Sequence, residues 1–190
     1  YKYDGFKWLR QTTATPGASD KVYVLGNTNA GLCVSGSNDI SVVSGSLMAD
    51  FMVATGAEAN LNGNISVSGD LTNDGTVNCG TSSLTMNGST DQTISGNATG
   101  LYNMTVDKSS GNLIMSTPIT VTGTLTMTSG DIVNSQPITI GSSDDITGAI
   151  SYNSGVITGQ VKRFFASGTG SKFFPVGVAG IERGVTVNFA

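Results

Sequence analysis

Ile65-Ser66-Val67-Ser68-Gly69-Asp70-Leu71-Thr72 is echoed further along the chain by Ile119-Thr120-Val121-Thr122-Gly123-Thr124-Leu125-Thr126. Each copy consists of a short alternating apolar and polar stretch, a Ser/Thr-Gly corner and a second alternating stretch. Alternation with a period of two predicts β-strands that have one buried and one exposed face. Strands and corners that recur along a chain are typical of a solenoid, in which each repeat stacks on the previous one.

Similar strand patterns occur between and after the two copies. They begin at Ile65, Leu84, Tyr102, Ile119 and Ile138, which are nearly evenly spaced. We interpret each step as one coil, which predicts that the two copies occupy equivalent positions three coils apart. The predicted fold is all-β: a right-handed parallel β-helix of seven or eight coils over residues 22–160, with short strands and a C-terminal β element over residues 161–190.

The alternation also assigns residues to the inside or the outside of the coils. The predicted outward residues are Ser66, Thr85, Thr105, Thr120 and Thr139. The predicted inward residues are Ile65, Val67, Leu71, Leu84, Met86, Met104, Val106, Leu113, Met115, Ile119, Val121, Leu125, Met127, Ile138 and Ile140. Burial of an aliphatic side chain contributes roughly 1.5–3 kcal/mol. A single coil cannot close a core, but a stack of coils shares one.

The two ends of the sequence are more aromatic than the repeats. Residues 1–21 contain Tyr1, Tyr3, Phe6 and Trp8 among basic residues, and we interpret this segment as a cap on the open end of the stack. The rival interpretation is a recognition strip, because exposed aromatic side chains are good binding anchors. The C-terminal element contains Phe164, Phe165, Phe173 and Phe174. We predict that these eight aromatic residues mark two ends that contact other copies or neighbouring domains.

Composition excludes several classes of function. Charged residues make up 12% of the chain, and its net charge of −4 with nine basic residues gives no electrostatic footprint for nucleic acid. No apolar run is long enough to span a membrane. The chain contains no His, which excludes His-based catalytic triads and most zinc sites. We predict no cofactor.

The two cysteines, Cys33 and Cys79, leave two interpretations open. A disulfide between them fits an extracellular protein, but requires that they stack in adjacent coils. The alternative is two small buried apolar residues, which we favour because Cys is commonly buried.

Acidic residues are the candidates for catalysis or metal binding. Asp144 and Asp145 form the only adjacent acidic pair, and neighbouring residues of a strand face opposite ways. The other aspartates are scattered at corners, where Asp usually forms turns by bonding its own backbone. Because the acidic residues are scattered, we predict no catalytic residues. A polysaccharide-active enzyme on a β-helix is the third and least favoured hypothesis. For calcium, Asp74, Asp144 and Asp145 are the candidates, although no known calcium-loop motif is present.

Outward threonines are the most regular polar feature of the sequence. The candidates for a flat ladder on one face are Thr85, Thr105, Thr120, Thr124, Thr126 and Thr139. Such a ladder fits an ice-binding surface or a carbohydrate-binding surface, and it also fits ordinary solvent-facing strands, which we favour. For a glycan ligand, the stacking candidates are Trp8 and Tyr102.

Two segments resemble a known group of proteins. Residues 101–111, Leu-Tyr-Asn-Met-Thr-Val-Asp-Lys-Ser-Ser-Gly, and residues 118–127, Pro-Ile-Thr-Val-Thr-Gly-Thr-Leu-Thr-Met, resemble repeats of large secreted surface proteins of Bacteroidetes. That group includes adhesin-like and gliding-associated proteins exported by the type IX system. Gly159-Gln160-Val161-Lys162-Arg163 and Phe173-Phe174-Pro175-Val176-Gly177 resemble the segment that follows such repeats. The resemblance covers residues 19–189 and implies an extracellular, β-rich module of a long surface or filament protein.

These observations favour a non-enzymatic structural module of an extracellular adhesin, stalk or filament that contacts itself or neighbouring domains. The alternative is a carbohydrate-binding module of a surface adhesin, with glycans as partners. The strand pattern at residues 185–190 runs to the last residue, which predicts a boundary inside a larger chain.

Overall fold

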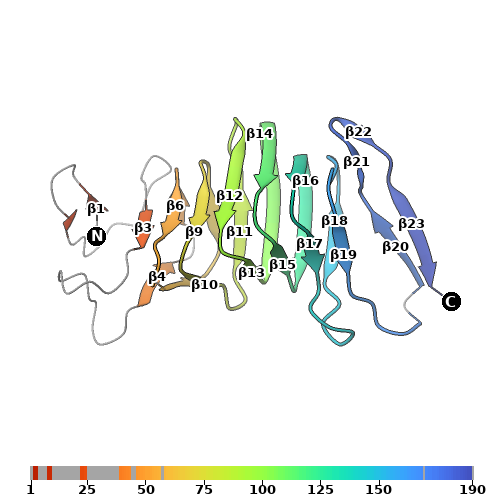
Figure 1. Ribbon diagram of the computed structural model, residues 1–190, viewed down its shortest axis with the longest axis horizontal. Helices are drawn as coiled ribbons and strands as arrows, with labels where there is room; N and C mark the ends of the chain where they lie inside the picture. The colour runs from red at the N-terminus through yellow and green to blue at the C-terminus, as the bar shows by residue number, and fades with distance from the viewer. Residues whose placement is uncertain are drawn as a thin grey trace.

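The computed structural model describes residues 2–3, 8–9, 22–24, 39–43, 46–56, 58–168 and 170–189, and for the strands before residue 49 it describes the backbone alone. All secondary-structure elements of this part are β-strands, and most of them stack in parallel along one axis (Figure 1). The predicted all-β parallel solenoid with a C-terminal β element is therefore confirmed.

The coils have three sides, each a stack of parallel strands. Side 1 consists of β5 (Ser46–Met48), β8 (Ile65–Val67), β11 (Ser83–Met86), the first part of β14 (Asn103–Met115), the first part of β16 (Thr124–Asn134) and β18 (Ala149–Tyr152). Side 2 consists of β3 (Val22–Val24), β6 (Phe51–Val53), β9 (Leu71–Asn73), β12 (Gln92–Gly96) and the second parts of β14 and β16. Side 3 consists of two consecutive ladders that meet at β10 and β13 without pairing there. The first contains β4 (Asp39–Val43), β7 (Glu58–Asn62) and β10 (Thr76–Asn78), and the second contains β13 (Thr99–Leu101), β15 (Ile119–Val121), β17 (Ile138–Ile140) and β19 (Val161–Arg163).

The described part forms about six turns, fewer than the predicted seven or eight. On side 1, Ile65 stacks on Leu84, Leu84 on Met104, Met104 on Leu125 and Leu125 on Ile150. The distance along the chain between stacked partners grows with each of these steps, and after the first step it exceeds the predicted spacing. On sides 2 and 3 the steps rise and fall from coil to coil, because the corners between strands differ in length while the inward triplets keep their size.

The echo that opens the sequence relates two different sides of the coil, and the prediction of equivalent positions was wrong. Ile65–Val67 forms β8 on side 1 and is followed by β9 on side 2. Ile119–Val121 forms β15 on side 3 and is followed by β16 on side 1 of the next coil. Strands on all three sides have the same local pattern, an inward-outward-inward triplet followed by a tight corner. Two similar sequences can therefore occupy different sides of the coil.

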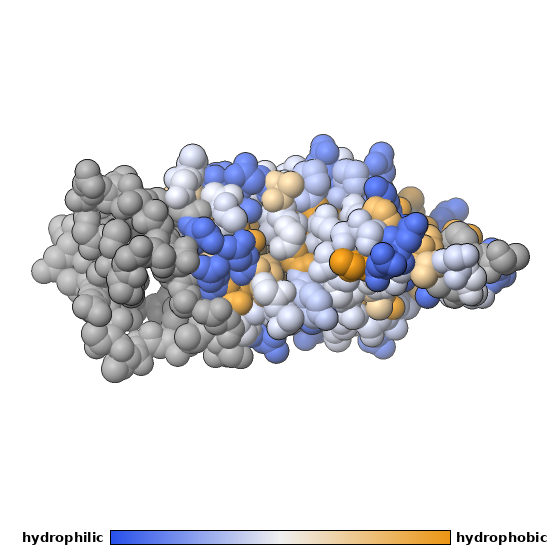
Figure 2. All heavy atoms as spheres, turned by 90° about the horizontal axis from the view of Figure 1, so that it is seen from below, coloured by the Kyte–Doolittle hydropathy of each residue, from blue (hydrophilic) through white to orange (hydrophobic). Residues whose placement is uncertain are grey.

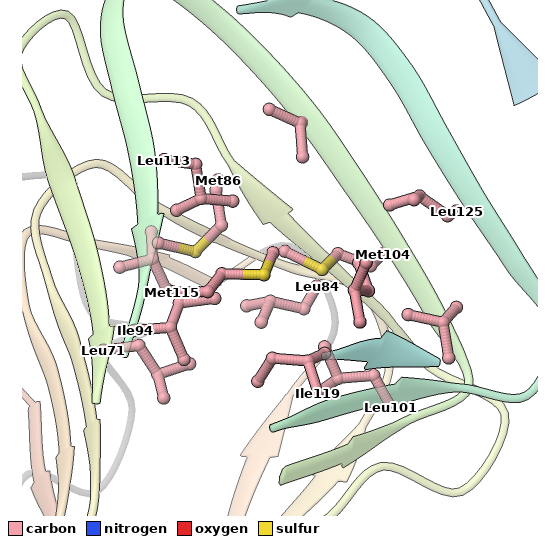
Figure 3. Close-up of a cluster of buried hydrophobic side chains, with 14 of the residues drawn as sticks. Leu71, Leu84, Met86, Ile94, Leu101, Met104, Leu113, Met115, Ile119 and Leu125 are labelled. Carbon is pink, nitrogen blue, oxygen red and sulfur yellow. The ribbon is translucent and has the colours of Figure 1, made fainter. Parts of the chain in front are cut away.

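The core consists of aliphatic and Met side chains that stack between coils. All the predicted inward residues are buried, with at most 1% of their surface exposed. Met86, Met104 and Met115 point toward one another among the leucines and isoleucines (Figure 3). The predicted outward residues Ser66, Thr85, Thr105, Thr120 and Thr139 are all partly exposed. Alternation within each strand therefore predicted inside and outside correctly.

Antiparallel pairs lie at both ends of the described sequence. β1 (Lys2–Tyr3) pairs with β2 (Trp8–Leu9) near the N-terminus. Near the C-terminus, β20 (Gly170–Phe174) pairs with β23 (Val185–Phe189), and β21 (Gly177–Val178) pairs with β22 (Ile181–Glu182). Residues 161–163, placed by sequence in the C-terminal element, form β19 and continue the side 3 stack.

Candidate functional surfaces

The six threonines of the predicted ladder lie on two sides of the solenoid and not on one face. On side 1, one column stacks in register across five coils: Ser66, Thr85, Thr105, Thr126 and Ser151. Thr124 lies beside this column on the same side. Thr120 and Thr139 stack on each other on side 3. The predicted single ladder of six threonines is thus divided, although three of them do form one straight column.

Tyr102 lies at the edge of side 1, at the corner between β13 and β14. Its side chain is 40% exposed, and its backbone carbonyl accepts a 2.7 Å hydrogen bond from the Gly123 N–H. Tyr102 precedes Thr105, the hydroxyl-column residue of the same coil, by three residues. The other predicted stacking residue, Trp8, has its backbone in β2, and its side chain lies outside the described residues.

Aspartates line the corner between sides 1 and 2, where their carboxylates join successive coils. Asp50 accepts a hydrogen bond from the Asp70 N–H at 3.1 Å, and Asp70 accepts one from the Thr93 N–H at 2.7 Å. In the same way, Asp91 accepts a hydrogen bond from the Asn112 N–H and Asp131 accepts one from the Val156 N–H, each in the coil that follows. We expected corner aspartates to bond their own backbone, but these four bond the neighbouring coil.

A buried Lys and a buried Gln form a polar cluster at the same corner. The Lys108 ammonium donates hydrogen bonds to the Gly88 carbonyl at 3.1 Å, the Thr90 carbonyl at 2.7 Å and the Gln92 Oε1 at 3.0 Å. Three acceptors match the three N–H bonds of an ammonium group. Lys108 is 2% exposed, and Gln92 is fully buried. We call these two side chains and their bonds the Lys108–Gln92 cluster.

The Lys108–Gln92 cluster connects three successive coils. The Gln92 amide group accepts a hydrogen bond from the Gly88 N–H at 2.7 Å and donates to the Val67 and Gly69 carbonyls of the preceding coil. Burial lowers the pKa of Lys108, and the negative charges of Asp91 and Asp70 oppose that shift. Neither Gln92 nor Lys108 was predicted to be buried. The alternation of β12 puts Gln92 on the same face as Ile94, so the burial of Gln92 could have been predicted. Lys108 lies at a corner, where alternation does not indicate which side chains are buried.

The structure does not bring the calcium candidates together. Asp74 lies at the corner after β9, and Asp144 and Asp145 lie in the connection between β17 and β18, all three with exposed side chains. Among the residues that the structure describes, no three His, Cys, Asp or Glu side chains form a group that could hold a metal ion.

Cys79 is buried, and its thiol is free. Cys33 lies outside the described residues. Burial raises the pKa of the Cys79 thiol to about 11, against the opposing effect of a hydrogen bond from the Tyr102 backbone. The burial of Cys79 agrees with its interpretation as a small buried residue.

This raised pKa predicts a specific alkaline loss of stability. An unfolded thiol loses its proton near pH 8.5, whereas the folded thiol keeps it up to about pH 11, so the unfolded chain binds fewer protons between these values. The contribution of Cys79 to stability is therefore complete below pH 8.5 and falls as pH rises. Relative to Cys79→Ala, the wild type should lose about 2.5 kcal/mol by pH 10.5. Urea unfolding at pH 7 and pH 10.5 measures this difference, and parallel pH profiles of the two proteins would contradict it.

Three of the four predicted C-terminal end residues form two ring pairs at the last coil. Phe173 packs against Tyr152 of β18 with ring centroids 5.2 Å apart, and Phe174 packs against Phe165 at 6.2 Å. Lys162 lies over the Phe164 ring, 4.6 Å from its centroid. At the other end, Tyr1 and Phe6 lie outside the described residues, and of Tyr3 only the backbone in β1 is described.

Arg163 links the two ring pairs. Its guanidinium lies 5.8 Å from the Phe165 centroid and 5.4 Å from the Phe174 centroid, and it donates a 2.9 Å hydrogen bond to the Phe173 carbonyl. Burial lowers the pKa of Arg163. A cation between two aromatic faces and a carbonyl is well suited to hold a folded-over segment.

The surface of the coils is mainly polar, and large exposed hydrophobic residues concentrate near the C-terminus (Figure 2). Four of the six that the structure describes belong to the C-terminal element: Val178, Ile181, Val185 and Val187. β23 therefore combines exposed apolar side chains with an edge that has no strand partner within the described residues.

The fold and these contacts define a parallel β-solenoid whose coils are joined at one corner by buried and exposed side-chain hydrogen bonds. No protein-family model matches the sequence, and neither a curated protein nor a solved structure matches it. The described part contains no helix long and apolar enough to cross a membrane. The functional proposal therefore rests on the residues of the chain itself.

Proposed function

We propose that the chain is a non-enzymatic structural module of an extracellular adhesin, stalk or filament, in which it acts as a stiff spacer. The observation that supports this role is the double connection between coils. Backbone ladders join side 1 without a gap from β5 to β18. Side-chain bonds from the corner aspartates and the Lys108–Gln92 cluster add a second set of links along the same axis.

Extracellular placement is part of this proposal. It is supported by the surface of short, uncharged polar side chains and by the resemblance of residues 101–127 and 159–177 to secreted Bacteroidetes surface proteins. Protease treatment of intact producing cells tests it. The chain should be accessible to antibody before treatment and should be lost afterwards, and a chain found only in lysed cells would contradict the placement.

Single-molecule stretching through the two termini tests the mechanical role. Each coil of about 20 residues should release about 70 Å of chain when it opens. We expect a series of separate force peaks with this spacing, because each coil is bonded to its neighbours by both backbone and side chains. Smooth extension at low force would contradict the proposed spacer.

A carbohydrate-binding role is the second candidate, and the exposed Tyr102, three residues before Thr105 of the side 1 hydroxyl column, favours it. An exposed ring can stack on a sugar, and hydroxyl groups at about 4.8 Å spacing can bond it along the axis. The natural partner of such an uncharged surface is a neutral glycan.

Glycan-array binding followed by substitution tests this second role. Tyr102→Ala should weaken binding at least about tenfold, which corresponds to about 1.4 kcal/mol. Thr105→Ala lies in the side 1 column and should also weaken binding, whereas Thr120→Ala on side 3 is the matched control and should not. Equal effects of the two Thr substitutions, or no glycan bound by the wild type, would contradict this role.

A further inference from the structure

The last coil is closed less completely than the coils before it. The inward residues of the preceding coil, such as Leu125 and Ile138, have no exposed surface. In the last coil, Ile150 and Tyr152 of β18 and Val161 of β19 are only partly buried. The hydrophobic core therefore reaches the C-terminal end of the solenoid without another coil on top of it.

Two strands of the last coil also have free edges. Within the described residues, β18 pairs only with β16, and β19 pairs only with β17. Side 2 alone continues, because Ile157 bonds to the segment that leads into β21: its N–H donates to the Pro175 carbonyl at 2.8 Å, and its carbonyl accepts from the Gly177 N–H at 3.2 Å. Open strand edges are sites at which another chain can pair.

The β20–β23 hairpin lies beyond these edges without pairing with them. It follows β18 and β19 at the C-terminal end of the stack (Figure 1). Its strands pair with each other, and its contact with the last coil is made by side chains, chiefly Phe173 on Tyr152. The chain therefore covers its own C-terminal end with aromatic side chains and does not extend the ladders of sides 1 and 3.

Besides the two backbone bonds of Ile157, three polar contacts among the described residues hold the hairpin and its β21–β22 extension in this position. Arg163 donates to the Phe173 carbonyl at 2.9 Å, the Tyr152 hydroxyl donates to the Glu182 carboxylate at 2.8 Å, and the Gly180 N–H donates to Asp131 at 2.8 Å. By contrast, β14 and β16 are joined by a ladder along most of their length. A segment with few anchors and exposed strands opens more easily than the ladder beneath it.

We propose that the hairpin is a releasable cap that prevents the C-terminal ends of two copies from pairing through β18 and β19. This inference rests on the proposed structural role, which it extends to assembly. The free edges of β18 and β19 lie on different sides of the coil, and a single added strand can pair with only one of them. The end of another solenoid has strands on both sides and can therefore pair with both edges. Because each copy contributes the same end, the product is a closed two-fold dimer.

The test compares the full chain with a variant whose cap is weakened, Tyr152→Phe combined with Arg163→Ala. Arg183→Ala is the control, because it removes one positive charge from an exposed residue that follows β22. Gly177→Ala weakens the cap independently, since a Cβ at this position would lie 2.2 Å from the Ile181 carbonyl oxygen. Light scattering measures the mass, and hydrogen exchange measures the opening of residues 170–189.

We expect the wild type and Arg183→Ala to be monomers. Both weakened variants should show faster exchange in residues 170–189, unchanged slow exchange in residues 103–134 and a twofold higher mass at high concentration. The slow exchange of residues 103–134 verifies that the solenoid is folded. In the dimer, the amides of β18 and β19 should exchange more slowly than in the variant monomer.

Four results would overturn the cap: a wild-type dimer, faster exchange of the hairpin without dimer formation, unchanged exchange of the hairpin in both folded variants, or open-ended polymers in place of a dimer. If a weakened variant stays monomeric but keeps the force peaks of the wild type, the hairpin is not a cap against dimer formation, and the proposed structural role still holds. Loss of those peaks in the wild type itself would count against the structural role.

Discussion

Replacing Gly155 with Ala should lower the free energy of unfolding by about 4 kcal/mol. Gly155 lies at the corner after β18, with φ at +92°, a conformation that L-residues rarely adopt. A Cβ at this position would lie 2.1 Å from the Gly130 carbonyl oxygen in the coil below. Backbone strain of about 1–3 kcal/mol and displacement of a backbone oxygen in a closely packed stack act together.

Gly168 provides the matched control for this substitution. Its φ of +72° is also positive, but nothing lies within 4 Å of a Cβ built there. Gly168→Ala should therefore cost only the backbone strain, about 1 kcal/mol. Urea unfolding of both variants measures the difference. Equal destabilisation would show that close stacking of the corners does not limit the side chain at residue 155.

Replacing Lys108 with Met should lower the free energy of unfolding by about 3 kcal/mol. The substitution keeps the side-chain length but leaves the Gly88 and Thr90 carbonyls without their ammonium donor and removes one of two donors to the Gln92 Oε1. An unsatisfied buried acceptor costs about 1–3 kcal/mol. Relief of the ammonium desolvation acts in the opposite direction, but it is smaller than the loss at several acceptors.

Lys162→Met is the control for Lys108, because Lys162 is exposed and lies over a single ring. It should cost less than about 1 kcal/mol. A double-mutant cycle of Lys108→Met and Gln92→Leu measures the interaction energy between the two side chains. We expect a coupling energy of about 1–2 kcal/mol. A fully additive pair would contradict the existence of one connected cluster.

Prediction from sequence succeeded where a strand decides its own arrangement. The alternation in Leu84-Thr85-Met86 requires that one face be apolar, and burial of that face follows from the hydrophobic effect alone. The same argument correctly assigned Met104, Thr105 and Val106. It also predicted the fold class, because short apolar triplets cannot form a core without stacking.

Prediction failed where position around the coil matters. Ile119 and Ile138 were predicted to begin new turns on the side of Ile65, but they lie on side 3. The corner lengths decide which side a strand reaches, and they vary from coil to coil: the step from Leu125 to Ile150 is longer than the step from Ile65 to Leu84. When an average repeat length is applied along the chain, the error in the predicted side of the coil grows with each coil. The sequence of a single triplet does not show which side that triplet occupies.

The sequence by itself determined the strands, their buried faces and the parallel stack, because each of these follows from the local period of apolar residues. Only the tertiary structure decided which hydroxyl groups form one column, that Lys108 meets Gln92, and that Phe173 and Phe174 pack against Tyr152 and Phe165. These contacts join residues of different coils, or strands and the segment that folds back on them. Their geometry depends on every corner between them, and those corners are fixed only when the coils pack together.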